Sequence, residues 1–302
     1  MSVVVVLLLL AVAALWGASF LFIRVAVTDF GPVALIETRV LLAGVALWLV
    51  LSLARRGLPN WRAQGRRYLV LGAVSAGLPF TLIAVAEQEL TSGLAATLNA
   101  TTPLFTLLIG ALYGQEQLNA RRLAGVLCGV VGVAVLVGLG PLQPSLAVLL
   151  AVAASLLAAV CYAIGGVYAK RHFSATPPIT VATGQQLGAA AVLLPITPFA
   201  MPDKVPSAAS AGAAIALALP CTALGFALFY RIVARRGPTT ALAVTLLVPP
   251  FGLVWGAVFL REPLTPSMLV GLVIVLASVA LITRRTSRAQ TPRMAAQGAE
   301  EV

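Results

Sequence analysis

Residues 103–118 read PLFTLLIGALYGQEQL, and residues 249–264, which lie 146 positions later, read PPFGLVWGAVFLREPL. The two stretches share proline, phenylalanine, glycine and glutamate at equivalent positions, and chance rarely aligns these residue types in an apolar sequence. The same shift aligns the longer windows 91–136 and 237–282 without a gap and gives 12 identities in 46 positions. The chain therefore contains two copies of one unit.

The composition indicates a membrane protein, because 60% of the 302 residues are hydrophobic and 10% are charged, against roughly 25% charged in a soluble domain. A helix needs about 20 apolar residues to cross the hydrocarbon core. We therefore expect an all-α membrane protein with ten transmembrane helices, five in each copy, and no room for a soluble catalytic domain. The expected spans lie near 4–26, 33–54, 68–86, 92–113, 121–139, 146–169, 179–200, 209–230, 239–260 and 266–283.

An odd number of spans in each copy places the second copy upside down relative to the first, as in alternating-access transporters. We therefore expect a first five-helix repeat at 1–140 and a second, inverted repeat at 141–284. The remaining residues, 285–302, are rich in Ser, Arg, Gln and Ala, a composition typical of a disordered tail.

The charge distribution predicts the orientation. The net charge is +11, and sixteen of the twenty Lys and Arg residues fall on one side of the ten-helix arrangement. The positive-inside rule then predicts a multi-pass protein of the inner (plasma) membrane with both termini in the cytoplasm. Because membrane topology explains the positive charge, we expect no nucleic-acid partner. An N-terminal signal peptide is the alternative for the first apolar run, but the run is too long for a signal-peptide core.

Catalytic signatures are absent from the sequence. His172 is the single histidine and lies in a basic loop, so the sequence offers no zinc site and no Ser/His/Asp or Cys/His arrangement. No GxxxxGK motif is present. We therefore expect no enzyme, no metal and no cofactor, and a small-molecule substrate and the lipid bilayer as partners.

Polar and aromatic residues inside the spans are the candidates for a binding site, because such groups are costly in hydrocarbon unless they face protein or water. Trp16 and its repeat partner Tyr162 both lie near mid-membrane and precede small residues. Pocket lining and simple core packing are both open interpretations. The substrate-binding candidates are Trp16, Ser19, Asn99, Thr102, Tyr162, Thr245 and Trp255.

A second group of intramembrane residues fits structural or gating roles. Arg39 and its partner Gln185 are polar at equivalent depths, which fits a structural bond or, less directly, substrate contact. Pro103 and Pro249 free backbone carbonyls and can bend their helices. Glu116 and Glu262 end the fourth spans of the two repeats on opposite membrane faces, where helix capping or a gate edge suits a carboxylate.

The pattern resembles the EamA family of ten-helix permeases in the drug/metabolite transporter superfamily, over roughly residues 4–284. The motifs that carry the resemblance are Trp16-Gly17, Arg39, Pro103, Glu116-Gln117-Leu118, Pro249 and Glu262-Pro263-Leu264. The resemblance implies two inverted five-helix bundles around a central cavity lined mainly by spans one, three, four, six, eight and nine. It also implies export or facilitated movement of amino acids, related metabolites or drugs. Gln185 stands where a second basic residue would complete a symmetric anion site.

The sequence thus predicts a secondary transporter that moves a small amphipathic metabolite by alternating access. A passive membrane pore or lipid scramblase is the alternative, since the same helices could form one. An intramembrane enzyme is a third possibility, but the sequence offers no arrangement of a nucleophile and a base for it.

Overall fold

The computed structural model describes residues 3–114, 116–138, 145–202, 205–241 and 243–283, and every regular element in these ranges is helical. The first copy contains α1 (Val3–Phe30), α2 (Pro32–Leu53), α3 (Trp61–Gly72), the π-helical segment η1 (Ala73–Gly77), α4 (Leu78–Ala86), α5 (Ser92–Asn99), α6 (Thr102–Leu112) and α7 (Ala120–Gly138). The second copy contains α8 (Leu146–His172), α9 (Pro178–Leu193), the short 3-10 helix η2 (Thr197–Phe199), α10 (Ala208–Ala216), the π-helical segment η3 (Leu217–Leu224), α11 (Gly225–Arg236), α12 (Pro238–Ala241), α13 (Ala243–Leu260) and α14 (Pro266–Thr283). The predicted tail at 285–302 lies outside the described residues.

Nine helices of the described chain are long and apolar enough to cross a membrane. The segment expected near 179–200 forms only the 16-residue helix α9. Pro195 and Pro198 follow it, and proline cannot donate the backbone hydrogen bond that would continue the helix. The ten expected spans are therefore present only if this short helix is included.

One helix begins before its expected span. The third span is expected near 68–86, whereas the helix that contains it covers Trp61–Ala86. Asn60 caps its first turn, because the Asn60 side chain accepts a hydrogen bond from the backbone N–H of Ala63 at 3.1 Å. Basic residues expected in a loop, such as Arg66, are therefore helical.

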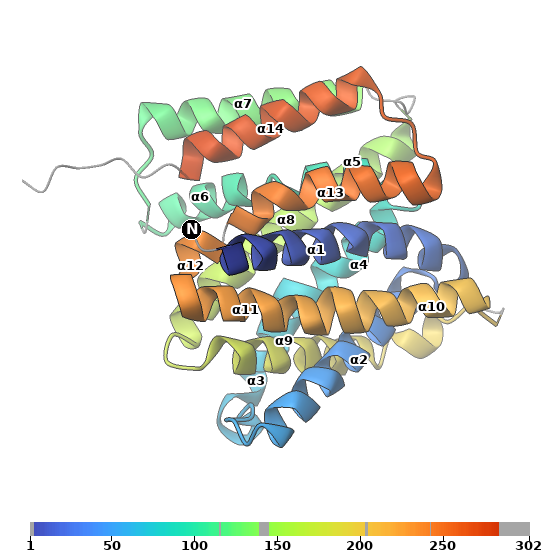
Figure 1. The fold of residues 1–302 in the computed structure, drawn as a ribbon, viewed down its shortest axis with the longest axis vertical. Helices are drawn as coiled ribbons and strands as arrows, with labels where there is room; N and C mark the ends of the chain where they lie inside the picture. Colours follow the sequence, from blue (N-terminus) through green and yellow to red (C-terminus); the bar gives the residue numbers. More distant parts are fainter. Residues whose placement is uncertain (1–2, 115, 139–144, 203–204, 242, 284–302) are drawn as a thin grey trace, which may run out of the picture.

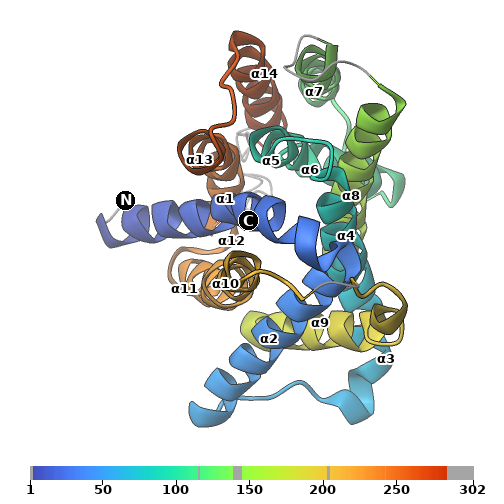
Figure 2. The ribbon, with the colours of Figure 1, turned by 90° about the vertical axis from the view of Figure 1, so that its right-hand side faces the viewer.

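Helices of the two copies interlock instead of forming separate bundles (Figure 1). Helix α7 lies alongside α14, and α2 packs on α9, so the equivalent second and fifth spans of the two copies pair with each other. Helix α1 packs on α13, α10 and α11, while α8 packs on α4, α5 and α6. Figure 2 shows the α7 and α14 pair at one edge and α2, α3 and α9 at the opposite edge, with α1 between them.

Small residues allow the closest of these approaches. A Cβ atom at Gly129 would lie 2.1 Å from Leu104 Cδ2 and 2.8 Å from Ser278 Oγ of α14. A Cβ atom at Gly72 would lie 2.3 Å from the backbone nitrogen of Ala189 in α9. The Gly125-xxx-Gly129 pattern in α7 thus packs against α14 of the same chain.

Three spans are interrupted at mid-length. Residues 100–101 separate α5 from α6, and the π-helical segments η1 and η3 interrupt the third and eighth spans. Shifting η1 by 146 residues gives 219–223, which lies inside η3 (Leu217–Leu224). π-helical turns are frequent at functional sites. Because η1 and η3 lie at equivalent positions in the two copies, the residues around them are candidates for a functional site.

Candidate binding site between the two copies

Two aromatic pairs with equivalent positions bridge the copies. Trp16 of α1 contacts Phe226 of α11 edge-on, with ring centroids 5.7 Å apart and an interplanar angle of 68°. Tyr162 of α8 contacts Phe80 of α4 in the same way, at 6.1 Å and 61°. Each residue of the second pair differs by 146 positions from its counterpart in the first. The aromatic residues predicted from the repeat therefore have equivalent surroundings.

Arg39 lies beside one of these pairs. Its side chain is 6% exposed, and its Cζ atom lies 3.7 Å from the centre of the Phe80 ring, which is cation–π distance. Its Nε donates a hydrogen bond of 2.9 Å to the hydroxyl of Thr222 in η3. Among the described residues no carboxylate lies within ion-pair distance of Arg39. The interface thus holds a buried guanidinium that forms no ion pair within the described chain.

Gln185, the repeat partner of Arg39, also reaches a π-helical segment of the other copy. Its Nε2 donates to the backbone oxygen of Ser75 in η1 at 3.3 Å. Pro79 lies four residues after Ser75 and lacks the N–H that would bond this oxygen within the helix. Gln185 therefore bonds a backbone oxygen of the other copy, which fits a structural role.

At the interruption between α5 and α6, a side-chain hydroxyl replaces a backbone N–H as a hydrogen-bond donor. Pro103 cannot donate to the backbone oxygen of Asn99, and the hydroxyl of Thr102 donates to that oxygen instead, at 2.7 Å. The Thr102 hydroxyl at the start of α6 is thus bonded to the last residue of α5. The side-chain oxygen of Asn99 is buried and has no hydrogen-bond partner among the described residues.

Two further candidates are engaged in intrachain bonds. The indole N–H of Trp255 donates to the backbone oxygen of Ala14 at 3.0 Å and ties α13 to α1. The hydroxyl of Ser19 is buried and donates weakly to the oxygen of Leu15 at 3.4 Å. Thr245 and Pro249 lie in α13, where Thr245 is partly buried and Pro249 is buried. The rings in contact with Trp255 in the described chain are those of Phe251 and Phe259, not those of Trp16 or Tyr162.

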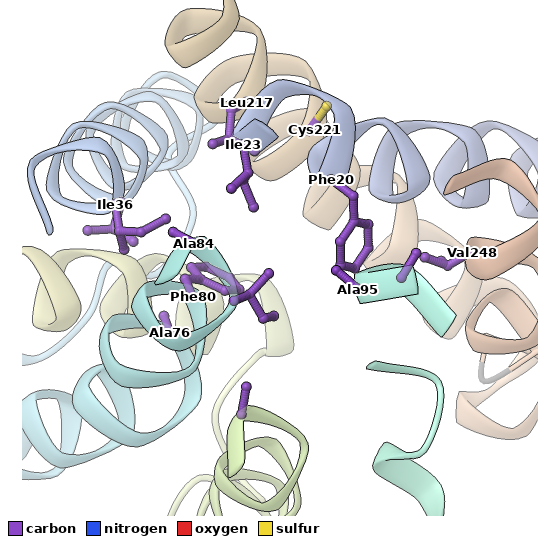
Figure 3. Packing of buried hydrophobic residues seen from close by; sticks show 14 of the residues in the cluster. Phe20, Ile23, Ile36, Ala76, Phe80, Ala84, Ala95, Leu217, Cys221 and Val248 are labelled. Carbon is purple, nitrogen blue, oxygen red and sulfur yellow. The ribbon is translucent and has the colours of Figure 1, made fainter. Parts of the chain in front are cut away.

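An apolar cluster fills the interior between the copies. Figure 3 shows buried side chains of this cluster from several helices, such as Phe20 of α1, Phe80 of α4 and Ala95 of α5. Trp16 and Tyr162 border the same cluster. The surroundings of Arg39 are therefore largely apolar and aromatic, which suits the hydrocarbon part of an amphipathic ligand.

Glu262 caps a helix of the other copy. Its carboxylate accepts hydrogen bonds from the N–H and the hydroxyl of Ser92, both at 2.8 Å, and from the N–H of Gly93 at 3.3 Å. These groups begin α5, where the helix dipole favours a negative charge. This end of the molecule, where α1 ends at Phe30, is called the Phe30 end.

Asp29 makes a comparable link at the Phe30 end. Its Oδ2 accepts hydrogen bonds from the N–H and hydroxyl of Ser207, at 3.0 and 2.7 Å, and from the hydroxyl of Ser210 at 2.7 Å. Ser207 is the N-cap of α10. Asp29 belongs to the first copy and Ser207 to the second, so a second carboxylate joins the copies at this end.

Glu116, the repeat partner of Glu262, is engaged differently at the opposite end, called the Val3 end. Both glutamate N–H groups donate to an equivalent glycine oxygen, of Gly110 or Gly256, at 3.2 Å. The Glu116 carboxylate, however, is 46% exposed and pairs with Arg122 of its own copy at 3.0 Å. Ala175 stands where the repeat of Asp29 falls. Glu262 and Asp29 thus form carboxylate bonds between the copies at the Phe30 end. The equivalent residues at the Val3 end, Glu116 and Ala175, do not form such bonds in the part of the chain that the structure describes.

Several members of the interface are not predictable from residue type. Phe80 and Phe226 are apolar residues of a kind common in membrane spans. Ser75 and Thr222 are small polar residues, which are also common inside spans. The signal was present, because Phe80 and Phe226 lie 146 positions apart, as do Trp16 and Tyr162.

The chain is similar along most of its length to proteins named as exporters. It is 30% identical over 281 residues to a "Probable terminal-alkyne amino-acid exporter" of Streptantibioticus cattleyicolor, covering 90% of each chain. It is 27% identical to a "Probable amino-acid metabolite efflux pump" of Salmonella typhimurium, covering 93% of this chain and 97% of the other. A solved crystal structure with 21% identity has the same fold, with a TM-score of 0.63 over 93% of this chain and 96% of that chain.

The family described as the EamA-like transporter family matches the chain twice, at residues 3–138 and 148–284. Together with the long apolar helices, the two matches identify a multi-pass membrane protein of a transporter family, in which no catalytic activity is indicated. The chain belongs to the EamA-like transporter family.

Proposed function

We propose that this protein is a secondary transporter of the inner (plasma) membrane that exports small amphipathic metabolites, such as amino acids or related compounds. It works by alternating access between two inverted five-helix repeats, with both termini in the cytoplasm and without a cofactor. The names of the two exporters similar to this chain support the direction and the substrate class.

The observation that carries the proposal is the position of Arg39 between the copies. Its guanidinium is buried against the Phe80 ring and bonds to Thr222 only through Nε. The two terminal nitrogens of a guanidinium can hold a carboxylate through a pair of parallel hydrogen bonds. In our account, Arg39 binds the carboxylate of the substrate, and Phe80, Tyr162 and Trp16 contact its apolar part.

The bonds at the two ends support alternating access. In our account the Phe30 end faces outwards, and the capping of α5 by Glu262 and of α10 by Asp29 closes it. At the Val3 end, the carboxylate of Glu116 pairs within its own copy. Opening the outer end requires Glu262 to leave Ser92, and closing the inner end brings Glu116 towards the start of α12, the counterpart of α5.

A growth screen tests the export proposal. A sensitive bacterial host expressing the protein is exposed to toxic amino acids, their analogues and cationic drugs. We expect resistance to carboxylate-bearing amphipathic compounds, and we expect the Arg39→Gln variant to lose it while inserting normally. Resistance to none of these compounds by the inserted protein, or equal resistance in the Arg39→Gln variant, would contradict the proposal.

A further inference from the structure

A second site lies on the surface of α2, away from the Arg39 interface. A cavity of about 400 Å³ opens between α2 and the segment that follows α9 at the Phe30 end. This volume lies within the range of small-molecule sites, roughly 300–1,000 Å³. Glu37 lines the cavity, and because it is two residues from Arg39 it projects from a different face of the helix.

Among the described residues that line the cavity, three side chains are polar and the others are apolar. Two of them are satisfied by their own helices, because the hydroxyl of Thr38 donates to Ala34 O at 2.8 Å and that of Thr197 to Leu193 O at 3.0 Å. The third is Glu37, which is 5% exposed and whose two carboxylate oxygens are buried without a hydrogen-bond partner among the residues that the structure describes. A buried carboxylate without a partner is costly, so this group requires a counter-ion or a proton.

The mouth of the cavity faces the bilayer. Leu41 and Leu42 of α2 and Met201 of the opposite wall all line the cavity and are exposed. Exposed leucines in a membrane-spanning helix contact lipid chains. A ligand therefore enters sideways from the membrane, and it must combine a hydrocarbon part with a group that complements a carboxylate.

We propose that this cavity binds an ammonium group carried on a hydrocarbon chain, with Glu37 as its counter-ion. The ammonium donates hydrogen bonds to the two unpartnered carboxylate oxygens, and the chain lies against the apolar wall. Such a group has two sources in a bacterial membrane, the headgroup of phosphatidylethanolamine and a free alkylamine. The inference does not depend on transport, since binding is measured directly.

Mass spectrometry of the intact protein tests the lipid source. The protein is purified from an equal mixture of phosphatidylethanolamine and phosphatidylglycerol, and the retained lipids are counted. For the lipid source, we expect wild type to retain phosphatidylethanolamine in preference and Glu37→Gln to lose that preference. Glu89→Gln is the matched control, because Glu89 is an exposed carboxylate near the same end and outside the cavity.

Titration with decylammonium, with decanoate as the comparison, tests the free-amine source in phosphatidylcholine nanodiscs. We expect about tenfold weaker decylammonium binding by Glu37→Gln, equivalent to roughly 1.4 kcal/mol, and no such change in Glu89→Gln. Thr38→Leu, which narrows the cavity but keeps the carboxylate, should weaken binding as well. Amine binding without lipid retention would assign the free source. The proposal would be overturned if Glu37→Gln changed neither the lipid preference nor the decylammonium affinity. This outcome does not depend on the result of the transport screen.

Discussion

The carboxylate of Glu262 accepts hydrogen bonds from both the N–H and the hydroxyl of Ser92, each at 2.8 Å, and so joins the end of α13 to the start of α5. Its repeat partner Glu116 has the same backbone bond to a preceding glycine but pairs with Arg122 instead. Two equivalent residues thus have different partners at the two ends of the molecule. In a transporter that alternates between two states, each state is asymmetric, because one end is closed while the other is open. Different partners for Glu262 and Glu116 are therefore expected in either state.

Glu262→Gln should destabilise the protein more than Glu116→Gln. Hydrogen bonds to a charged group at a helix start contribute about 1.5–3 kcal/mol, whereas an exposed ion pair such as Glu116–Arg122 contributes roughly 0–1 kcal/mol. Thermal unfolding of the two purified variants in the same detergent measures the difference. An equal loss of stability in both would show that the Glu262 cap does not hold the copies together.

Arg39→Lys should reduce transport by about tenfold or more, although it preserves the charge. A lysine ammonium is a compact donor that cannot contact Phe80, bond Thr222 and present a planar pair of donors at once. We expect the loss in the apparent KM for the substrate, because the change removes a substrate contact. Unaltered transport kinetics in Arg39→Lys would remove Arg39 from the binding site.

Trp16→Ala and Asn99→Ala should weaken transport without preventing membrane insertion. Trp16 loses its contact with Phe226, and Asn99 loses the buried oxygen that has no partner in the described chain. Trp48→Ala is the control, since Trp48 is exposed on α2 and takes no part in the interface. Normal efflux by both test variants, at matched expression, would exclude this assignment.

Gly72→Ala should be strongly destabilising. The added methyl would lie 2.3 Å from the backbone nitrogen of Ala189, and backbone cannot rotate away as a side chain can. Overpacking of this kind costs about 1–3 kcal/mol. Gly166→Ala in α8 is the matched control, because nothing lies within 4 Å of its added methyl. Fluorescence-detected size-exclusion after heating should separate the variants, and comparable melting would contradict the close packing of α3 on α9.

Glu87 predicts a pH dependence of stability. It lies in the turn after α4, and its burial, with a smaller contribution from Glu262, raises the pKa of its carboxyl well above the usual range against the opposing effects of Arg24 and Arg39. The folded state then holds this proton more tightly than the unfolded state, so stability is greatest below the unfolded pKa and falls as the pH rises towards the folded one. Melting temperatures between pH 5 and 9 should fall in wild type and less in Glu87→Gln. Identical slopes would contradict the prediction.

The 146-residue repeat made much of the fold predictable, because a Pro, Gly and Glu pattern aligns without any structural knowledge. The length of α9 could not be predicted from hydropathy alone, since Pro195 and Pro198 end the helix inside an apolar run. The partners of Trp255 and Thr102 also escaped prediction. A hydrogen bond from Trp255 to a backbone oxygen of α1 depends on helix packing, which sequence spacing does not specify.

Counterflow in proteoliposomes tests the central claim most directly, with a compound identified by the growth screen as the labelled substrate. The alternating-access account predicts saturable uptake that is accelerated when unlabelled substrate is present inside, and that is lost in Arg39→Gln. Uptake that rises linearly with concentration and ignores internal substrate would contradict the account and would indicate a passive pore or scramblase.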